Sequence, residues 1–140
     1  MIKVLSFRLA GELFGIEINY VKEINRNVEY TAVPRAPDKI VGLFNMRGQI
    51  VTLFNLAKIL GYPWAGDHGK VTCIILKSPP NNPNQQGFLI DATGDVLDLD
   101  ESLCEPPPAN IDGRNFQYIR KVARLDHELL MIIEPELIFN

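Results

Sequence analysis

Apolar and polar residues alternate along most of this chain, which is typical of β-strands with one buried face. Apolar residues occupy every second position in 5–9 and again in 14–18, and the intervening Gly11-Glu12 pair favours a tight turn. Further short apolar runs, separated by turn-forming residues, lie at 40–45, 50–54, 71–76, 87–90, 119–125 and 129–133. The pattern predicts an all-β protein that begins with an antiparallel hairpin.

Helical patterns are few and short. Asn55 can cap a helix whose apolar residues in 56–60 share one face, and Gly61 stands at the usual stop position. Pro135 fits the first position of a second helix, with apolar residues behind it at 137–139. Each pattern follows two predicted strands, so we expect short connecting helices in a protein built mainly of strands.

These two helical patterns end two similar stretches of sequence. When the chain is shifted by 79 residues without a gap, 40–54 falls on 119–133, and both stretches predict a strand, a polar turn and a strand. A looser correspondence places 18–19 and 21–24 on 90–91 and 96–99, with a longer connection in the second copy. A unit of about 60 to 70 residues buries too little surface to be robust alone. We therefore expect two small β units packed together, with 78–86 as an exposed hairpin loop of the second.

The composition is that of one ordinary globular domain, with 140 residues, 46% of them hydrophobic and 22% charged. No apolar run approaches the roughly 18 residues of a membrane helix, and the start lacks a signal-peptide pattern, so we expect a cytoplasmic protein without membrane insertion. Residues 1–70 carry nine basic and six acidic side chains, and 71–140 carry five and eleven. The net charge of the whole chain, −3, gives no electrostatic footprint for nucleic acid. Cys73 and Cys104 are predicted to be reduced thiols, Cys73 inside a buried strand.

Residues that could carry out catalysis are scarce. The sequence contains no Gly-rich phosphate loop, His-Glu-x-x-His helix or Gly-x-Ser-x-Gly turn. His68 and His127 stand alone in predicted turns, which disfavours a zinc site, and the acidic run 91–105 lacks the spacing of a calcium loop. We expect no enzyme activity, cofactor or metal ion. The alternatives are a small-ligand or nucleotide-binding β-barrel and a metal-assisted hydrolase that uses Asp91, Asp95 and Asp98.

The turn between the strands predicted at 40–45 and 50–54 carries a more specific signal. Gly48 follows Arg47 there, and a glycine in a tight hairpin allows the backbone a positive φ. The arginine is then held at the tip, where its guanidinium can make a planar, forked contact with a carboxylate or a carbonyl of a partner. A merely solvated turn is the alternative.

This turn belongs to a motif, Gly-x-x-Asn-x-Arg-Gly, that occupies 42–48 and leads into an apolar strand. Through this motif the chain resembles the CheW-like domain family, and the resemblance covers nearly the whole chain. It implies one domain over 1–140, built of two intertwined SH3-like five-stranded β-barrels with a hydrophobic groove between them. The first barrel is expected at about 14–70 and the second at about 71–140, where strand 2–10 can complete the second. The other matching segments are 14–18, 21–24, 33–37, 55–61, 87–91 with Val96, and 129–139.

The same resemblance implies a non-enzymatic signalling adaptor. Family members couple the cytoplasmic tips of methyl-accepting chemoreceptors to the regulatory domain of the histidine kinase CheA, which has the same fold, and they help to build receptor arrays at the membrane. Because 140 residues leave no room for a kinase or receiver module, the chain is similar to the stand-alone members. A pilus-driven twitching pathway or another chemosensory pathway remains an open alternative.

The resemblance also implies a set of partner-binding residues. Two valines and a glycine would border the groove that receives the receptor tip, a second glycine and an arginine would shape the neighbouring turn, and a glutamate and an asparagine would contact receptor or kinase. In that order, these residues are Val21, Val96, Gly42, Gly48, Arg47, Glu23 and Asn45. The alternatives are core positions for the valines, a backbone role for Gly42 and a solvated face for Glu23.

Overall fold

The computed structural model describes residues 1–63, 70–78, 84–109 and 113–139. Within them, the ten strands are β1 (Ile2–Leu9), β2 (Glu12–Glu17), β3 (Val21–Val28), β4 (Ile40–Met46), β5 (Gln49–Phe54), β6 (Val71–Leu76), β7 (Gln85–Ile90), β8 (Ala92–Leu99), β9 (Ile119–Arg124) and β10 (Leu129–Ile133). The helices are α1 (Leu56–Ile59) and α2 (Pro135–Ile138), with the short 3-10 turns η1 (Ile18–Tyr20), η2 (Glu101–Leu103) and η3 (Phe116–Tyr118).

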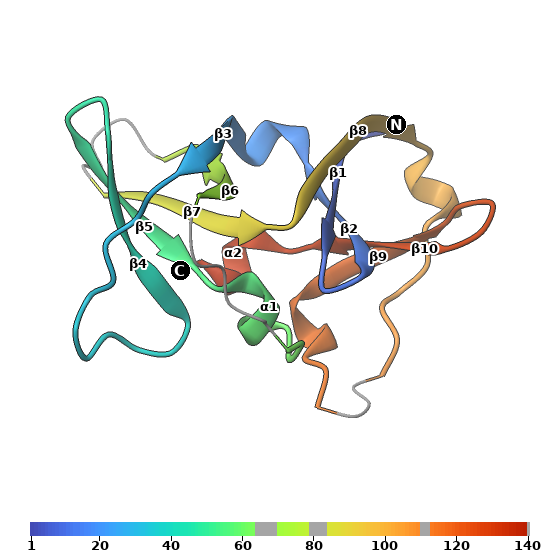
Figure 1. The fold of residues 1–140 in the computed structure, drawn as a ribbon. Helices are drawn as coiled ribbons and strands as arrows, with labels where there is room; N and C mark the ends of the chain where they lie inside the picture. The colour runs from blue at the N-terminus through green and yellow to red at the C-terminus, as the bar shows by residue number, and fades with distance from the viewer. Residues whose placement is uncertain (64–69, 79–83, 110–112, 140) are drawn as a thin grey trace.

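The strands form two five-stranded sheets that lie side by side, with α1 and α2 near the centre of the molecule (Figure 1). Sheet A has the order β8-β1-β2-β10-β9, and sheet B has the order β3-β6-β7-β5-β4. Both sheets pair their strands antiparallel except at one place, which is β2 with β10 in sheet A and β7 with β5 in sheet B. The prediction of an all-β protein with two five-stranded SH3-like units and short helices is confirmed.

The chain is divided between the sheets differently from the expectation. Sheet B is continuous in sequence over 21–90, whereas sheet A combines 2–17 with 92–133. The change of sheet therefore occurs near residue 91 and not at residue 70, because β6 and β7 pair with β3 and β5. The N-terminal hairpin β1–β2 pairs with β8 and β10 in sheet A.

The repeat in the sequence corresponds to a repeat in the backbone. A shift of 79 residues carries β4–β5 onto β9–β10, with the same irregularity in register, and it carries Leu43 onto Val122. Leu43 forms a bridge to Thr31, and Val122 forms one to Glu105, each through two N–H···O bonds of 2.8 to 2.9 Å. Each bridge joins one edge strand to the segment that follows the opposite edge strand. Each sheet therefore curls so that this isolated bridge joins its two edges at one point.

The upstream part of the repeat requires a correction. The residues of the two sheets can be matched by following the strand pairing outward from the parallel pair of each sheet. In this match Val96 on β8 corresponds to Ile24 on β3, and Thr93 corresponds to Val21. Over 21–25 this correspondence has a constant shift of 72 residues, so the expected placement of 21–24 on 96–99 is wrong. Both segments are edge strands with many solvent-exposed positions, where the sequence is only weakly constrained.

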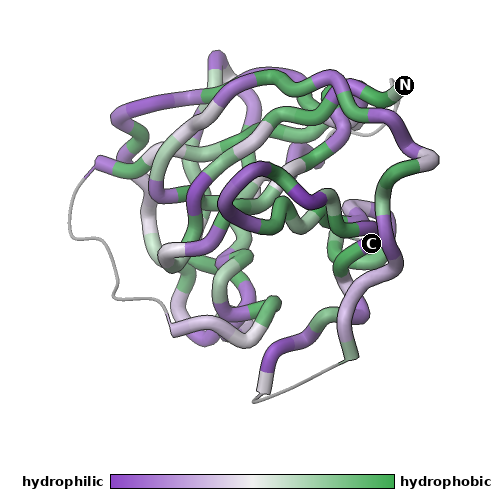
Figure 2. Tube along the Cα trace, turned by 90° about the vertical axis from the view of Figure 1, so that its right-hand side faces the viewer, coloured by the Kyte–Doolittle hydropathy of each residue, from purple (hydrophilic) through white to green (hydrophobic). Residues whose placement is uncertain are grey.

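The core consists of three apolar clusters, one shared by the two sheets and one inside each sheet. Alternate residues of a strand point to opposite faces, so Leu53 enters a cluster inside sheet B while Phe54 enters a cluster shared by both sheets. The shared cluster includes Phe7 of sheet A, Phe88 of sheet B and Phe139 after α2, and a third, smaller cluster lies inside sheet A. Figure 2 shows the apolar strand segments inside and the polar segments at the outer turns. The units thus depend on each other for much of their core.

Several local predictions can be compared with the structure. The Asn55 side chain caps α1 by accepting the Lys58 N–H at 3.1 Å, and Pro135 begins α2, as predicted. The first hairpin turns at Ala10 and Gly11, one residue earlier than expected. The loop predicted at 78–86 joins β6 to β7 in sheet B and not in the second unit, and its residues 79–83 lie outside the described residues.

Candidate partner-binding surface

The turn between β4 and β5 has the geometry that its sequence favours. Arg47 and Gly48 have positive φ angles of 52° and 85°, which is the type I′ turn that matches the twist of two antiparallel strands. The Asn45 side-chain oxygen accepts the Gly48 N–H at 2.8 Å and fixes the turn from one side. A non-glycine residue at positive φ is uncommon, so this turn holds Arg47 in a restricted conformation. The guanidinium therefore leaves the tip in a defined direction.

The Arg47 side chain reaches Glu23 on β3. Its guanidinium donates to both carboxylate oxygens, at 2.5 Å from Nη2 to Oε2 and at 3.3 Å from Nη1 to Oε1. The hydrogen bonds from Arg47 are the main reason that the pKa of Glu23 is lowered below its usual value. Arg47 therefore makes a forked contact within the chain, and the forked contact with a partner stays a prediction. Because 68% of the Arg47 side chain stays exposed against 25% of Glu23, the pair still presents its cationic group to solvent.

Gly42 lies beneath the bridge that closes sheet B. A Cβ atom at this position would be 2.4 Å from the Thr31 carbonyl oxygen and 2.8 Å from the Tyr30 ring. Only glycine therefore lets the segment after β3 approach β4 closely enough for the Thr31–Leu43 bridge. The structure supplies this backbone reason for Gly42. A contact of Gly42 with a partner stays a prediction.

The two valines predicted at the groove lie on different sheets. Val21 begins β3 and packs, partly buried, against the shared cluster, while Val96 on β8 is exposed. The two edge strands are linked where Arg26 of β3 donates to the Thr93 hydroxyl of β8 at 3.1 Å. The structure brings Glu23, Asn45, Arg47 and Gly48 together at one turn, and it places Val96 in the other sheet.

The family model of the CheW-like domain matches residues 3–140. The chain belongs to this family. A probable chemotaxis protein CheW of Rhizobium etli is 26% identical over 138 residues, covering 99% of this chain and 87% of that protein. The chemotaxis protein CheW of Treponema pallidum is 29% identical over 142 residues, covering 99% and 82%. The crystal structure of the scaffolding protein TtCheW from Thermoanaerobacter tengcongensis superposes with a TM-score of 0.84 at 29% identity, covering 99% of this chain and 88% of that one.

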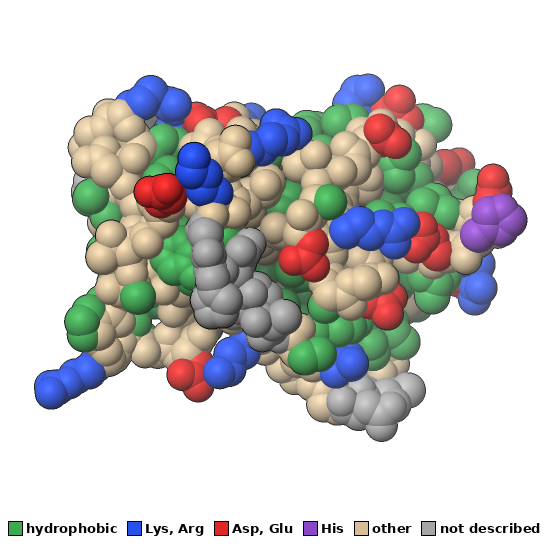
Figure 3. Space-filling view, in the orientation of Figure 1, with side chains coloured by type: hydrophobic (Ala, Val, Ile, Leu, Met, Phe, Trp, Pro, Cys, Tyr) green, Lys and Arg blue, Asp and Glu red, His purple; other side chains and the backbone are tan. Residues whose placement is uncertain are grey.

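The relatives are named as chemotaxis and scaffolding proteins, so the chain belongs to a family of scaffolding proteins in chemotaxis, and the prediction that it is not an enzyme is confirmed by this membership. Among the residues that the structure describes, no helix has the length and apolar content needed to span a bilayer. Figure 3 shows one face on which basic and acidic side chains lie close together, with hydrophobic atoms exposed between them. A mixed surface of this kind suits recognition of other proteins.

The acidic residues considered for a hydrolase do not form one site. The Asp91 carboxylate accepts the Ala10 N–H at 2.8 Å, and Asp98 pairs with Lys3 at 2.8 Å. Within the described parts of the chain, no three side chains of His, Cys, Asp or Glu are placed to hold a metal ion. His68, one of the two histidines considered for zinc, lies outside the described residues.

The structure adds one residue to the candidate surface. Ile50 lies directly opposite Asn45 in the β4–β5 pair, and about half of its side chain is exposed. Its neighbours Val51 and Leu53 are buried inside sheet B. Alternation along β5 places Ile50 on the face opposite to Val51 and Leu53, but Phe54 on the same face as Ile50 is buried, so alternation alone did not indicate that Ile50 is exposed. We define the Arg47 turn surface as Glu23, Asn45, Arg47, Gly48 and Ile50.

Proposed function

We propose that this chain is a scaffolding adaptor that couples the cytoplasmic tips of methyl-accepting chemoreceptors to the regulatory domain of the histidine kinase CheA. It acts in the cytoplasm, at receptor arrays associated with the membrane, and it uses no cofactor. The observation that carries the proposal is the match to the CheW-like domain over residues 3–140. Such a protein needs surfaces that bind by packing and charge, without reactive groups.

The Arg47 turn surface supports this proposal by its chemistry. It combines a guanidinium that is mostly exposed, a carboxylate that is mostly covered, and the exposed apolar side chain of Ile50. Arginine is enriched at protein interfaces, the buried core of an interface is more apolar than the rest of the surface, and a rigid turn loses little conformational freedom on binding. We propose that Arg47 and Ile50 contact a partner while Glu23, Asn45 and Gly48 hold the turn in shape.

The kinase partner is expected to bind sheet B. Because the kinase regulatory domain has the same fold by resemblance, we propose a pseudo-symmetric contact between sheet B here and one barrel of that domain. An interface at or below about 1,600 Å² suits a dynamic assembly and gives micromolar rather than nanomolar affinity. The valines and Gly42 would then belong to the receptor contact.

Exchanging the charges of Arg47 and Glu23 shows whether Arg47 contacts the partner directly or only supports the turn. Arg47→Ala should weaken binding of the kinase domain or the receptor tip about tenfold or more, as expected for a charged hydrogen bond worth about 1.5–3 kcal/mol. The double variant Arg47→Glu with Glu23→Arg restores the internal pair but reverses the charge that faces the partner. If Arg47 contacts the partner, the double variant binds as weakly as Arg47→Ala in isothermal titration calorimetry.

A matched exchange on the other sheet serves as the control. Arg8 and Glu128 form a similar forked pair, at 2.8 and 2.6 Å, between β1 and the β9–β10 turn. Arg8→Glu with Glu128→Arg should leave kinase affinity unchanged, and so should Asp98→Asn on β8. Full binding by the Arg47/Glu23 exchange variant would contradict direct contact, and loss of kinase binding in the sheet A variants would show that the wrong sheet has been chosen.

A further inference from the structure

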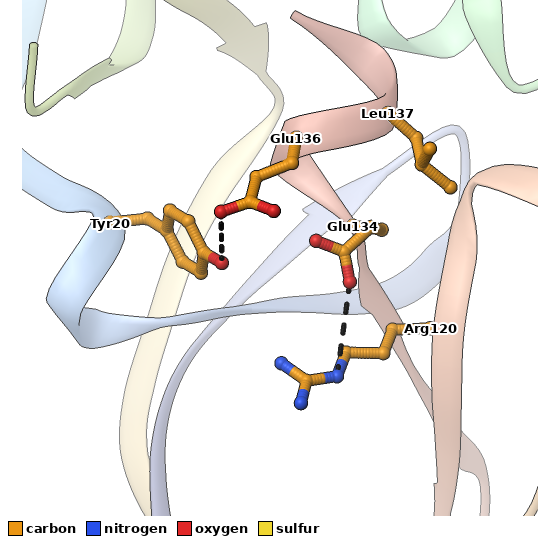
Figure 4. Close-up of a pocket in the computed structure, with 5 residues that line it drawn as sticks. All are labelled: Tyr20, Arg120, Glu134, Glu136 and Leu137. Carbon is orange, nitrogen blue, oxygen red and sulfur yellow. Dashed lines mark hydrogen bonds and ion pairs between the residues drawn. The ribbon is translucent and has the colours of Figure 1, made fainter.

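A cavity of about 460 Å³ opens in sheet A at the beginning of α2 (Figure 4). Tyr20 of η1, Arg120 of β9 and three residues at the start of α2, Glu134, Glu136 and Leu137, line it. Figure 4 shows the two glutamate carboxylates between the Tyr20 ring on one side and Leu137 on the other. The cavity therefore offers oxygen acceptors between an aromatic wall and an apolar side chain.

The positive charge in this cavity is largely engaged elsewhere. The Arg120 guanidinium makes its shortest contact with Glu17, which is not part of the lining, while its Nε lies 3.8 Å from Glu134. The neighbouring Lys121 is also engaged, because its Nζ lies 2.5 Å from Glu101. Glu134 is thus held only loosely by Arg120.

Both carboxylates that face the cavity keep acceptor capacity. Glu134 occupies the N-cap position of α2 without making a side-chain cap hydrogen bond, although its side chain is only 18% exposed. Glu136 accepts a long hydrogen bond of 3.4 Å from the Tyr20 hydroxyl. The pKa of Tyr20 is raised, first by burial and then by the charges of Glu136 and Glu134, so the cavity has a negative potential at the phenol.

The repeated fold does not require this arrangement. At the equivalent places in sheet B, 79 residues earlier, Val41 replaces Arg120, Asn55 replaces Glu134 and caps α1, and Ala57 replaces Glu136. Lys58 of sheet B occupies the place of Leu137. Leu137 itself lies on α2 and is 62% exposed. The acidic cavity and its apolar neighbour are therefore particular to sheet A.

We propose that this cavity binds an arginine side chain of a partner protein that presents an apolar residue next to that arginine. A planar guanidinium can donate to Glu134 and Glu136 together and lie against the Tyr20 ring, which a compact ammonium group does less well. Leu137 then packs against the apolar neighbour. This surface shares no residue with the Arg47 turn surface, so it goes beyond the proposed function and gives the scaffold a second docking point for a basic segment.

A pair of dipeptides tests the proposal directly. The protein, labelled with ¹⁵N, is titrated with acetyl-Arg-Leu-amide and with acetyl-citrulline-Leu-amide, which has nearly the same shape without the charge. The arginine peptide should cause saturable shifts of the backbone N–H signals of Tyr20, Glu136 and Leu137, with at least tenfold tighter binding than the citrulline peptide. Equal binding of the two peptides, or no saturable shift at these residues, would overturn the proposal.

Matched variants sharpen the test, and their ¹⁵N spectra report at the same time that the fold is kept. Glu136→Gln should weaken the arginine peptide about tenfold or more, because it removes a charged acceptor. Glu29→Gln makes the same change at an exposed position after β3 and should have no effect. Leu137→Ala should weaken acetyl-Arg-Leu-amide about fivefold but leave acetyl-Arg-amide unchanged. If Glu136→Gln behaves like Glu29→Gln, the cavity is not the binding site.

Discussion

Sheets A and B share one topology, yet they hold their hairpin turns differently. In sheet B the turn residue Arg47 forks onto Glu23 of β3, and β3 is the edge strand opposite the hairpin, so the pair spans the open side of the barrel. In sheet A the turn residue Glu128 forks onto Arg8 of β1, which is an inner strand. The repeated backbone therefore fixes where each turn lies, while side chains decide which strand the turn is tied to.

The open side of sheet A is closed by residues of β9 instead. Lys121 pairs with Glu101 at 2.5 Å, and Arg124 pairs with Glu105 at 2.7 Å, on the segment that follows β8. Lys121 occupies the place that Gly42 has in sheet B, where the segment after β3 comes too close for any side chain. Both sheets have the same backbone bridge. Sheet B adds the contact of the Arg47 turn with β3 and needs a glycine at the bridge, whereas sheet A adds ion pairs between long charged side chains.

The largest expected effect comes from the core that the two sheets share. Phe88 of sheet B packs against Phe7 of sheet A at 5.5 Å and against Phe139 at 5.4 Å between ring centroids. Phe88→Ala should lower the free energy of unfolding by about 3–5 kcal/mol. Because the cluster is common to both sheets, urea denaturation should remain a single transition.

Native-state hydrogen exchange checks whether the loss is shared. The N–H groups of β1 in sheet A and of β6 in sheet B should lose protection by the same factor in Phe88→Ala. As a comparison, Leu130→Ala removes a side chain from the cluster private to sheet A and should cost about 2–5 kcal/mol. Protection that falls in sheet B alone after Phe88→Ala would mean that the sheets unfold independently.

A smaller effect on stability should distinguish the bridge of sheet B, which needs a glycine, from that of sheet A, which carries ion pairs. Gly42→Ala places a methyl group against the Thr31 carbonyl and should lower the free energy of unfolding by about 1–3 kcal/mol. Lys121→Ala, at the equivalent place in sheet A, removes a partly exposed ion pair and should cost less than about 1 kcal/mol. The midpoints of urea denaturation measure both variants, and equal midpoints would contradict the difference in closure.

The strands that the sequence predicted are those with a buried face. β5, β6, β7 and β10 place side chains in two clusters at once, which produces long apolar runs that are easy to recognise. The edge strands β3 and β8 were not predicted, because most of their positions are partly or fully exposed and carry little apolar signal. The missed register between 21–24 and 96–99 has the same cause.

The sequence named every residue of the Arg47 turn surface except Ile50, but it did not predict how these residues are arranged. Gly48 indicates a turn with positive φ, and the turn was predicted from it. The contact of Arg47 with Glu23 joins residues 24 positions apart, and it depends on β3 lying at the sheet edge opposite β4. No local pattern contains that information. The cavity beside α2 likewise joins Tyr20 to Glu136 across almost the whole chain.

The smallest expected effect concerns the pH dependence of the Glu23–Arg47 pair. The folded pKa of Glu23 is lowered, so its contribution to stability is complete above the ordinary glutamate pKa and is lost as the pH falls through the lowered value. Because the Arg47 side chain is largely exposed and solvent screens the pair, Glu23→Gln should cost at most about 1 kcal/mol at pH 7 and nothing in strong acid. Carboxyl ¹³C titrations should show that Arg47→Met raises the pKa of Glu23 and leaves that of Glu128, which Arg8 lowers, unchanged. A pKa of Glu23 that does not move in Arg47→Met would show that the fork is absent in solution, and the turns of the two sheets would then differ less than their contacts indicate.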